Sequence, residues 1–178
     1  MVVGVPYVWS EVSEGGEKVS DQGIGDVSID IKWKFLEKDG LALALKPGIT
    51  LPTGDEDEGL GAGKLSYSAF VIASKEIDPL VFHLNVGYLR NESDFDERRD
   101  LWHVSLATEY AFAESWRLVT NIGQERNTNK ESDVNPAFIL GGAICSITED
   151  FDLDFGVKAG LNDAEADYAL LAGIALRF

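Results

Sequence analysis

The sequence GIGDVSIDIKWKFLEKDGLALALKPGITLPTGDEDEGLGAGK, residues Gly23 to Lys64, contains two long alternating segments joined by a tight turn. Side chains of a β-strand point to opposite faces in turn, so strict alternation predicts strands with one apolar and one polar face. Between the segments, Asp39-Gly40 supplies the positive φ angles that a short hairpin needs. The first segment sets apolar against polar residues as follows: Val27, Ile29, Ile31, Trp33 and Phe35 against Ser28, Asp30, Lys32 and Lys34. The second, Leu41–Leu51, alternates in the same way and ends in a glycine-rich acidic loop.

The rest of the chain repeats this unit. Short and long connections alternate along it, which predicts an antiparallel up-and-down sheet with short turns at one end and long loops at the other. The segment 137–147 is apolar on both faces, so its sides cannot be assigned. The ten predicted strands are 2–11, 27–35, 41–51, 64–74, 80–90, 101–111, 116–124, 137–147, 151–159 and 168–178.

These strands match the ~9–11 residues that cross a bilayer at a tilt, whereas strands of soluble proteins cluster near ~5–6 residues. Aromatic residues gather near the strand ends, as in the interfacial girdles of membrane barrels. The pattern therefore favours an all-β, antiparallel up-and-down transmembrane barrel, formed as one domain by residues 1–178. A soluble barrel of the lipocalin kind shows the same alternation, but it turns its apolar face inward.

Composition narrows the possible functions. A formal net charge of −16 in 178 residues argues against nucleic-acid binding, because phosphate recognition needs clustered Lys and Arg. The single cysteine, Cys145, excludes an internal disulfide framework and a thiolate metal cluster, and no cofactor is expected. The start, MVVGVPYVWSEV, has neither the basic nor the apolar region of a signal peptide.

Two resemblances point to the bacterial outer membrane. The end of the chain, Leu176-Arg177-Phe178, is similar to the terminal strand of outer-membrane barrels, which implies recognition of Phe178 by the barrel assembly machinery. The blocks VPYV (5–8), GIGDVSIDIKWKF (23–35), LPTGD (51–55) and GLGAGK (59–64) resemble the transporter family named for the meta-pathway of phenol degradation. This resemblance implies a barrel of about twelve strands that helps hydrophobic or aromatic compounds cross the outer membrane. Members of the family carry a signal peptide and about one further hairpin ahead of the VPYV block, so ten of the twelve strands are expected in residues 1–178.

The polar face of the predicted strands would line the lumen. Both charge signs occur there, so the residues can pair across strands into a network that fills the interior, or they can filter solutes by charge. We expect Lys32, Lys34, Arg117 and Lys158 to contribute most to selectivity. The predicted lumen residues are Asp30, Lys32, Lys34, Lys46, His83, Asn85, His103, Glu109, Arg117, Asn121, Asp152, Asp154, Lys158 and Arg177.

Other readings remain open at this stage. Most of the 31 acidic residues lie in the long connections, so the loops could bind hard cations or lipopolysaccharide, as in a structural or adhesive surface barrel. No spacing matches a calcium loop, and no metal site is assigned. His83, His103, Ser105 and Glu109 could be drawn as a hydrolase, but nothing orders a nucleophile beside a base, so no enzyme activity is expected. The expected function is passive uptake of small hydrophobic or aromatic compounds, with a soluble ligand-binding barrel as a further alternative.

Overall fold

The computed structural model describes residues 1–14, 17–93 and 95–176, and every regular element in them is a β-strand. The part of the chain described here contains no helix long and apolar enough to cross a membrane. The strands are β1 (Val2–Gly4), β2 (Tyr7–Glu14), β3 (Glu17–Ile24), β4 (Val27–Asp30), β5 (Trp33–Lys38), β6 (Leu41–Leu51), β7 (Ser66–Ile77), β8 (Leu80–Arg90), β9 (Asp100–Ala113), β10 (Trp116–Glu125), β11 (Ala137–Thr148), β12 (Phe151–Gly160) and β13 (Tyr168–Leu176).

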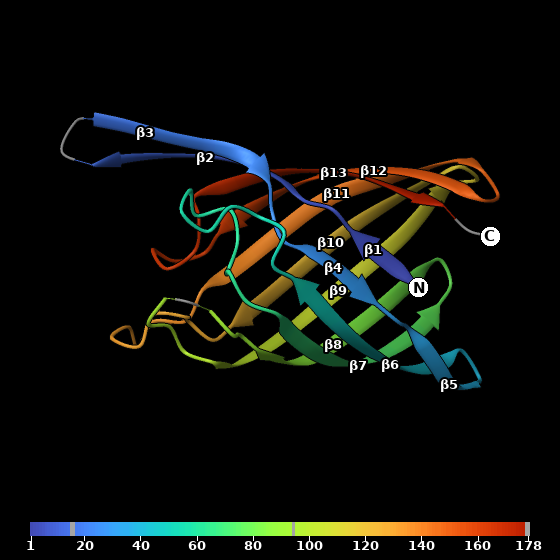
Figure 1. The fold of residues 1–178 in the computed structure, drawn as a ribbon. Coiled ribbons are helices and arrows are strands. Elements are labelled where there is room, and N and C mark those ends of the chain that lie inside the picture. Colours follow the sequence, from blue (N-terminus) through green and yellow to red (C-terminus); the bar gives the residue numbers. More distant parts are fainter. Residues whose placement is uncertain (15–16, 94, 177–178) are drawn as a thin grey trace.

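Eleven of these strands form one antiparallel sheet that curls into a half-barrel (Figure 1). From β6 to β13 each strand pairs with the next one along the chain, which confirms the predicted up-and-down order. At one end of the path, β1 pairs with β4. At the other end, β13 pairs with β12. The predicted residues Arg177 and Phe178 lie outside the described residues.

The connections divide between the two ends of the half-barrel as the sequence predicts. Tight turns join β5 to β6, β7 to β8, β9 to β10 and β11 to β12 at the turn end. The first of them uses Asp39 and Gly40 at φ angles of 51° and 71°, the conformation expected for Asp-Gly. Long loops follow β6, β8, β10 and β12 at the opposite end, which we call the loop end (Figure 1).

The N-terminal part differs from the prediction. The expected strand 2–11 is divided into β1 and β2 around Pro6, which has no N–H to continue a ladder. The expected loop between residues 11 and 26 is largely β-structure, because β2 and β3 pair with each other as a separate two-stranded sheet. This hairpin projects beyond the loop end of the half-barrel (Figure 1).

The predicted strand 27–35 is also divided, into β4 and β5, with a break at Ile31 and Lys32. Both strands pair with β6, but the register shifts between Lys34 and Leu36. Every residue of β5 is exposed, because β6 is its one partner among the described strands and β5 continues past the turn end (Figure 1).

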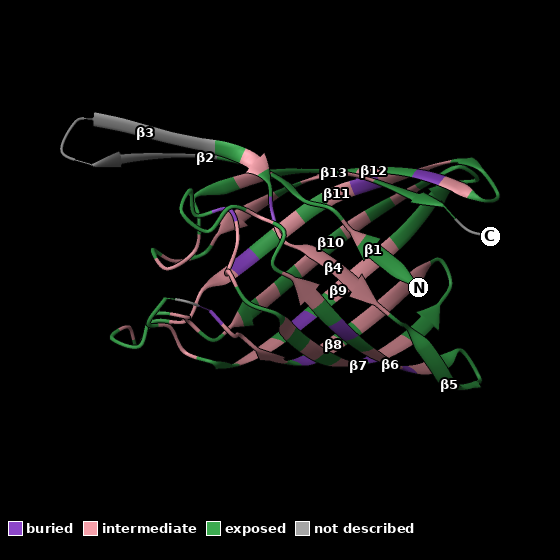
Figure 2. Cartoon of the chain, viewed as in Figure 1, coloured by how far each residue is buried: buried purple, intermediate pink, exposed green. Residues whose placement is uncertain are grey.

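The two faces of the curled sheet have opposite chemistry. Along β8, β9 and β12 the large apolar side chains stand exposed, as at Leu84, Leu106 and Phe155, of which 45%, 45% and 55% are accessible. Polar residues at the alternate positions are covered, and only 3% of Ser105 and of Asp152 is accessible. Figure 2 shows this alternation along the central strands. A soluble barrel of the lipocalin kind needs the reverse arrangement.

Candidate functional site

The covered polar face is the concave, interior face of the half-barrel. Its side chains reach across an intervening strand, which happens only where curvature makes them converge. Arg117 on β10 binds Asp152 on β12, across β11, with Nη2 2.8 Å from Oδ2. Likewise the ring of Phe70 on β7 contacts His103 on β9, with centroids 5.6 Å apart.

Toward the turn end, the interior carries a charged network centred on Arg117. Its guanidinium donates to Glu109 Oε2 at 3.2 Å and to Asp152 Oδ2 at 2.8 Å. The other oxygen of Glu109 lies 3.3 Å from Nε2 of His83, whose Nδ1 is 2.7 Å from the hydroxyl oxygen of Ser74. We call these five residues the turn-end network.

Strand register explains why these residues meet. Ser74 is directly opposite His83 in the β7–β8 ladder, and Glu109 is diagonal to His83 in the next ladder. Arg117 is paired with Ala111, and this small neighbour leaves the guanidinium free to turn toward Glu109. Two acids therefore share one arginine in a half-buried site.

Toward the loop end, the interior is built from aromatic rings and lysines. The His103 ring lies between Phe70 and Phe138, with centroid distances of 5.6 Å and 6.2 Å. Lys46 Nζ stands 4.8 Å from the centre of the Phe70 ring, and Lys158 Nζ stands 4.9 Å from that of Phe138. These are cation–π distances. We call these five residues the ring layer.

Two glycines make room for the rings. A Cβ on Gly87 would lie 2.5 Å from Cδ1 of Phe70, and a Cβ on Gly123 would lie 2.7 Å from Cζ of Phe138. Each ring therefore lies flat over a residue that has no side chain. Only glycine permits such a close approach of a ring to a strand.

A carboxylate accompanies each basic group of the ring layer. Lys46 is 3.7 Å from Asp30, and Lys158 is 2.9 Å from Glu165. His103 Nδ1 is 3.3 Å from Glu125. The layer thus presents ring faces and paired charges together, without a large excess of either sign.

Between the two groups, the interior is polar but carries few charges. Asn85 donates to the Ser105 hydroxyl at 3.3 Å. The side-chain oxygen of Asn121 is buried and makes no protein hydrogen bond. Asp154 lies on β12 beside Gly173, where a Cβ would come within 2.7 Å of its carboxylate.

The whole chain, residues 1–178, matches the family described as "Putative MetA-pathway of phenol degradation". The chain belongs to this family. No curated protein matches the sequence. The family expected from the sequence blocks is therefore confirmed, and in this chain it has the half-barrel fold with the two interior groups described above.

In this member of the phenol-degradation family, the interior collects all the predicted lumen residues that the structure describes except Lys32 and Lys34. The predicted lumen position is wrong for these two lysines. Lys32 lies exposed at the break between β4 and β5, and Lys34 pairs with Glu37 on the exposed β5. Lys34 pairs with buried Ala44, but among the described strands β6 is the one neighbour of β5.

Sequence reasoning missed the aromatic half of the interior. Phe70 interrupts the alternation of its strand, and this irregularity was the one signal of an inward ring. Phe138 lies in the segment whose sides could not be assigned, and its pairing places it inward next to Gly123. Glu165 lies in a long connection and was not among the predicted lumen residues, but it reaches Lys158.

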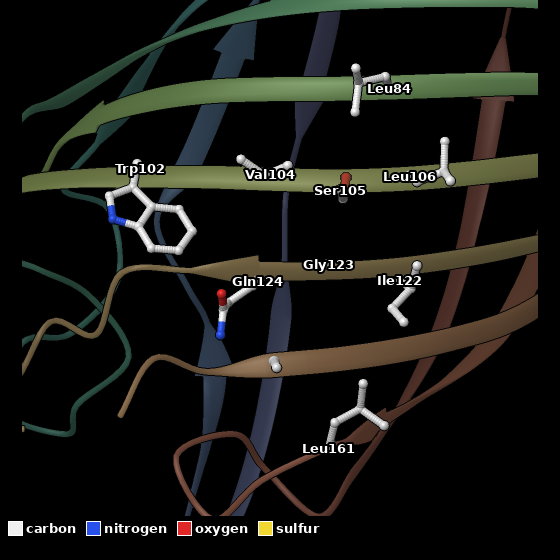
Figure 3. A pocket seen from close by; sticks show the side chains of 10 residues that line it. Leu84, Trp102, Val104, Ser105, Leu106, Ile122, Gly123, Gln124 and Leu161 are labelled. Carbon is white, nitrogen blue, oxygen red and sulfur yellow. The ribbon is translucent and has the colours of Figure 1, made fainter. Parts of the chain in front are cut away.

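The outer face of the wall carries a shallow apolar hollow of about 450 Å³ over β8, β9 and β10 (Figure 3). Outward side chains such as Leu84, Leu106 and Ile122 surround it, and Gly123 forms part of its floor. Its lining is almost entirely apolar, so it belongs to the same apolar exterior as the exposed residues of the neighbouring strands.

Some acids of the long loops form ion pairs. Lys130 pairs with Asp96, and so joins the loop after β8 to the loop after β10. Arg90 Nε donates to Glu92 at 2.7 Å, and this contact lowers the pKa of Glu92 below its ordinary value. Among the described residues, no three His, Cys, Asp or Glu side chains are grouped so that they could hold a metal ion.

Proposed function

We propose that the chain forms a bacterial outer-membrane barrel through which small hydrophobic or aromatic compounds pass down their concentration gradient. The observation that carries the proposal is the reversal of the two faces. The apolar side chains face outward, where lipid would solvate them, and the interior holds the polar groups and the ring layer.

The partners follow from the same arrangement. The exposed apolar belt would contact membrane lipid, with aromatic residues at its two borders. Tyr88 and Trp102 are paired neighbours near the loop end, and Tyr110 and Trp116 lie near the turn end. The acidic long loops would face lipopolysaccharide, whose phosphates share divalent cations with carboxylates.

The ring layer could bind an aromatic solute transiently during its passage. A planar solute can stack on the faces of Phe70 and Phe138, and the nearby ammonium and carboxylate groups can exchange hydrogen bonds with a ring hydroxyl. Such contacts are weak individually, which suits a pathway whose solute must leave as easily as it enters.

We propose passage without chemical conversion. Ser74, His83 and Glu109 form a line similar to a hydrolase triad. However, a triad also needs N–H donors for an oxyanion. The N–H groups around Ser74 are not free for this, because β7 is paired with β6 on one side and β8 on the other. The guanidinium of Arg117 is already engaged by two carboxylates. Ser105, the serine considered from the sequence, accepts a bond from Asn85 instead.

The test is uptake by Gram-negative cells that produce the barrel with an export signal. The outer-membrane fraction should contain a band whose gel mobility shifts on boiling, and those cells should take up a radiolabelled one-ring phenol faster than cells without the barrel. The double variant F70L/F138L removes both rings and keeps apolar volume, so it should lower phenol uptake and leave uptake of a small sugar unchanged.

Phe155→Leu is the matched control, because the same ring is lost from the exposed outer face. It should not alter uptake. Equal phenol uptake with and without the barrel would overturn the proposed function, and so would recovery of the chain as a soluble monomer without detergent.

A further inference from the structure

The sequence blocks that carry the family resemblance meet at one point at the loop end, around Asp26. This residue precedes β4, and its carboxylate accepts three backbone N–H groups from the loop 52–65. Oδ1 accepts from Thr53 at 3.1 Å and from Gly54 at 2.9 Å, and Oδ2 accepts from Ala62 at 2.8 Å. The loop is therefore bound near both of its ends by one side chain.

Thr53 strengthens the same junction. Its hydroxyl donates to the carbonyl of Gly25 at 3.1 Å and accepts the N–H of Val27 at 2.9 Å. Gly25 in turn donates its N–H to the carbonyl of Pro6 at 2.9 Å. The first long loop, the start of β4 and the base of the projecting hairpin are thus joined through consecutive hydrogen bonds.

Close packing around the carboxylate requires small residues. A Cβ on Gly61 would lie 2.5 Å from Oδ1 of Asp26, and a Cβ on Gly54 would collide with the carbonyl of Leu60. Leu60 itself is 8% exposed, and a Cβ on Gly23 would lie 2.7 Å from its Cδ1. The glycines of the family blocks therefore allow the chain segments around Asp26 to pack this closely.

The junction controls the position of an acidic turn. Residues 55–58, Asp-Glu-Asp-Glu, are exposed, and the turn is closed by the N–H of Leu60 donating to the carbonyl of Asp55 at 2.8 Å. Figure 1 shows the loop at the end of the half-barrel where the other long loops and the β2–β3 hairpin lie. A loop fixed there borders the entrance that a solute would use.

We propose that Asp26 is a positioning residue that latches the loop 52–65 against the base of the hairpin, and so limits how wide the entrance opens. Hydrogen bonds from N–H groups to an ionised carboxylate are stronger than those to neutral acceptors, so three of them can hold a loop in place. The latch itself is independent of solute passage, but its effect on the entrance rests on the proposed function.

The first readout is amide hydrogen exchange at Thr53, Gly54 and Ala62 in the detergent-solubilised barrel. Asp26→Asn replaces one oxygen by an NH₂ donor, which opposes an N–H group instead of accepting from it. Exchange at these amides should become about tenfold to a hundredfold faster. Asp163→Asn, an exposed carboxylate in the loop before β13, is the matched control and should leave them protected.

Gly61→Ala tests the latch without removing the charge. Its methyl group would displace the Asp26 carboxylate and press on the carbonyl of Gly54, so the same amides should lose protection. A heat-shifted gel band identifies variants that fold, and Gly61→Ala decides the matter if Asp26→Asn does not fold. Unchanged exchange at all three amides in a folded variant would overturn the proposal.

The second readout is the uptake ratio of a two-ring to a one-ring phenol in cells. A released loop should admit the bulkier solute severalfold better, and the control variant should keep the native ratio. A native ratio in variants whose amides have lost protection would overturn the role at the entrance. No uptake through the native barrel would instead refute the proposed function, while the exchange result would still decide whether Asp26 is a latch.

Discussion

Replacing Arg117 by methionine should destabilise the barrel, because its guanidinium forms ion pairs with two carboxylates. The Asp152 side chain is 4% exposed and that of Glu109 is 26% exposed, so both would stand close together in a site largely closed to water. Removing one member of a fully buried ion pair costs about 3–5 kcal/mol. Since Arg117 is itself 31% exposed, solvent screens part of this effect, and we expect a loss of about 2–3 kcal/mol.

The assay is unfolding by urea in lipid vesicles, followed by tryptophan fluorescence. The midpoint should fall by about 1–2 M for the single variant R117M. Arg126→Met removes an exposed arginine just beyond β10 and should change the free energy of unfolding by no more than about 0.5 kcal/mol.

A double variant separates charge burial from lost packing. In R117M/D152N the buried acid is neutral, so the double variant should recover at least about 1 kcal/mol of the loss caused by R117M alone. If R117M is as stable as the native chain, or if D152N adds its full cost to that of R117M, the turn-end network is not energetically coupled and the reasoning fails.

Three further predictions address the outer face, the ring layer and the loops. Leu84→Arg places a charge in the middle of the apolar exterior and should cost about 2–4 kcal/mol of unfolding free energy in vesicles, whereas a lipid-free face would tolerate it. Gly87→Val should displace the ring of Phe70 and lower stability by about 1–3 kcal/mol, and adding Phe70→Ala should restore part of it; a double variant no better than G87V would contradict the packing. The pKa of Glu92 is lowered from 4.5 by Arg90, so its stabilising contribution is complete above pH 4.5 and is lost as the pH falls through the lowered value; amide protection in the loop after β8 should decline on that acid side, and Glu92→Gln should weaken this pH dependence and leave the part that comes from Asp96, whose pKa is lowered by Lys130.

Much of the fold could be predicted because alternation is a local property. From Leu41 onward, each strand shows its two faces in its own residues, and the connection lengths give the antiparallel order. The same rule failed before Leu41, where alternation continues through Ile31 and Lys32 although the strand is broken. Whether a polar face is covered depends on neighbouring strands, and β5 has one neighbour, β6, among the strands that the structure describes.

The sequence indicated which charged residues lie on the polar face, but not which side chains contact one another. The sequence by itself determined which residues share the polar face, because a side-chain period of two leaves no other choice once a strand exists. Only the tertiary structure decided that Arg117 would reach across β11 to Asp152, that two phenylalanines would lie over glycines beside His103, and that Asp26 would collect N–H groups from a loop some thirty residues further on. These contacts depend on register and curvature, which arise when whole strands pair with one another and cannot be derived from the pattern of any single strand.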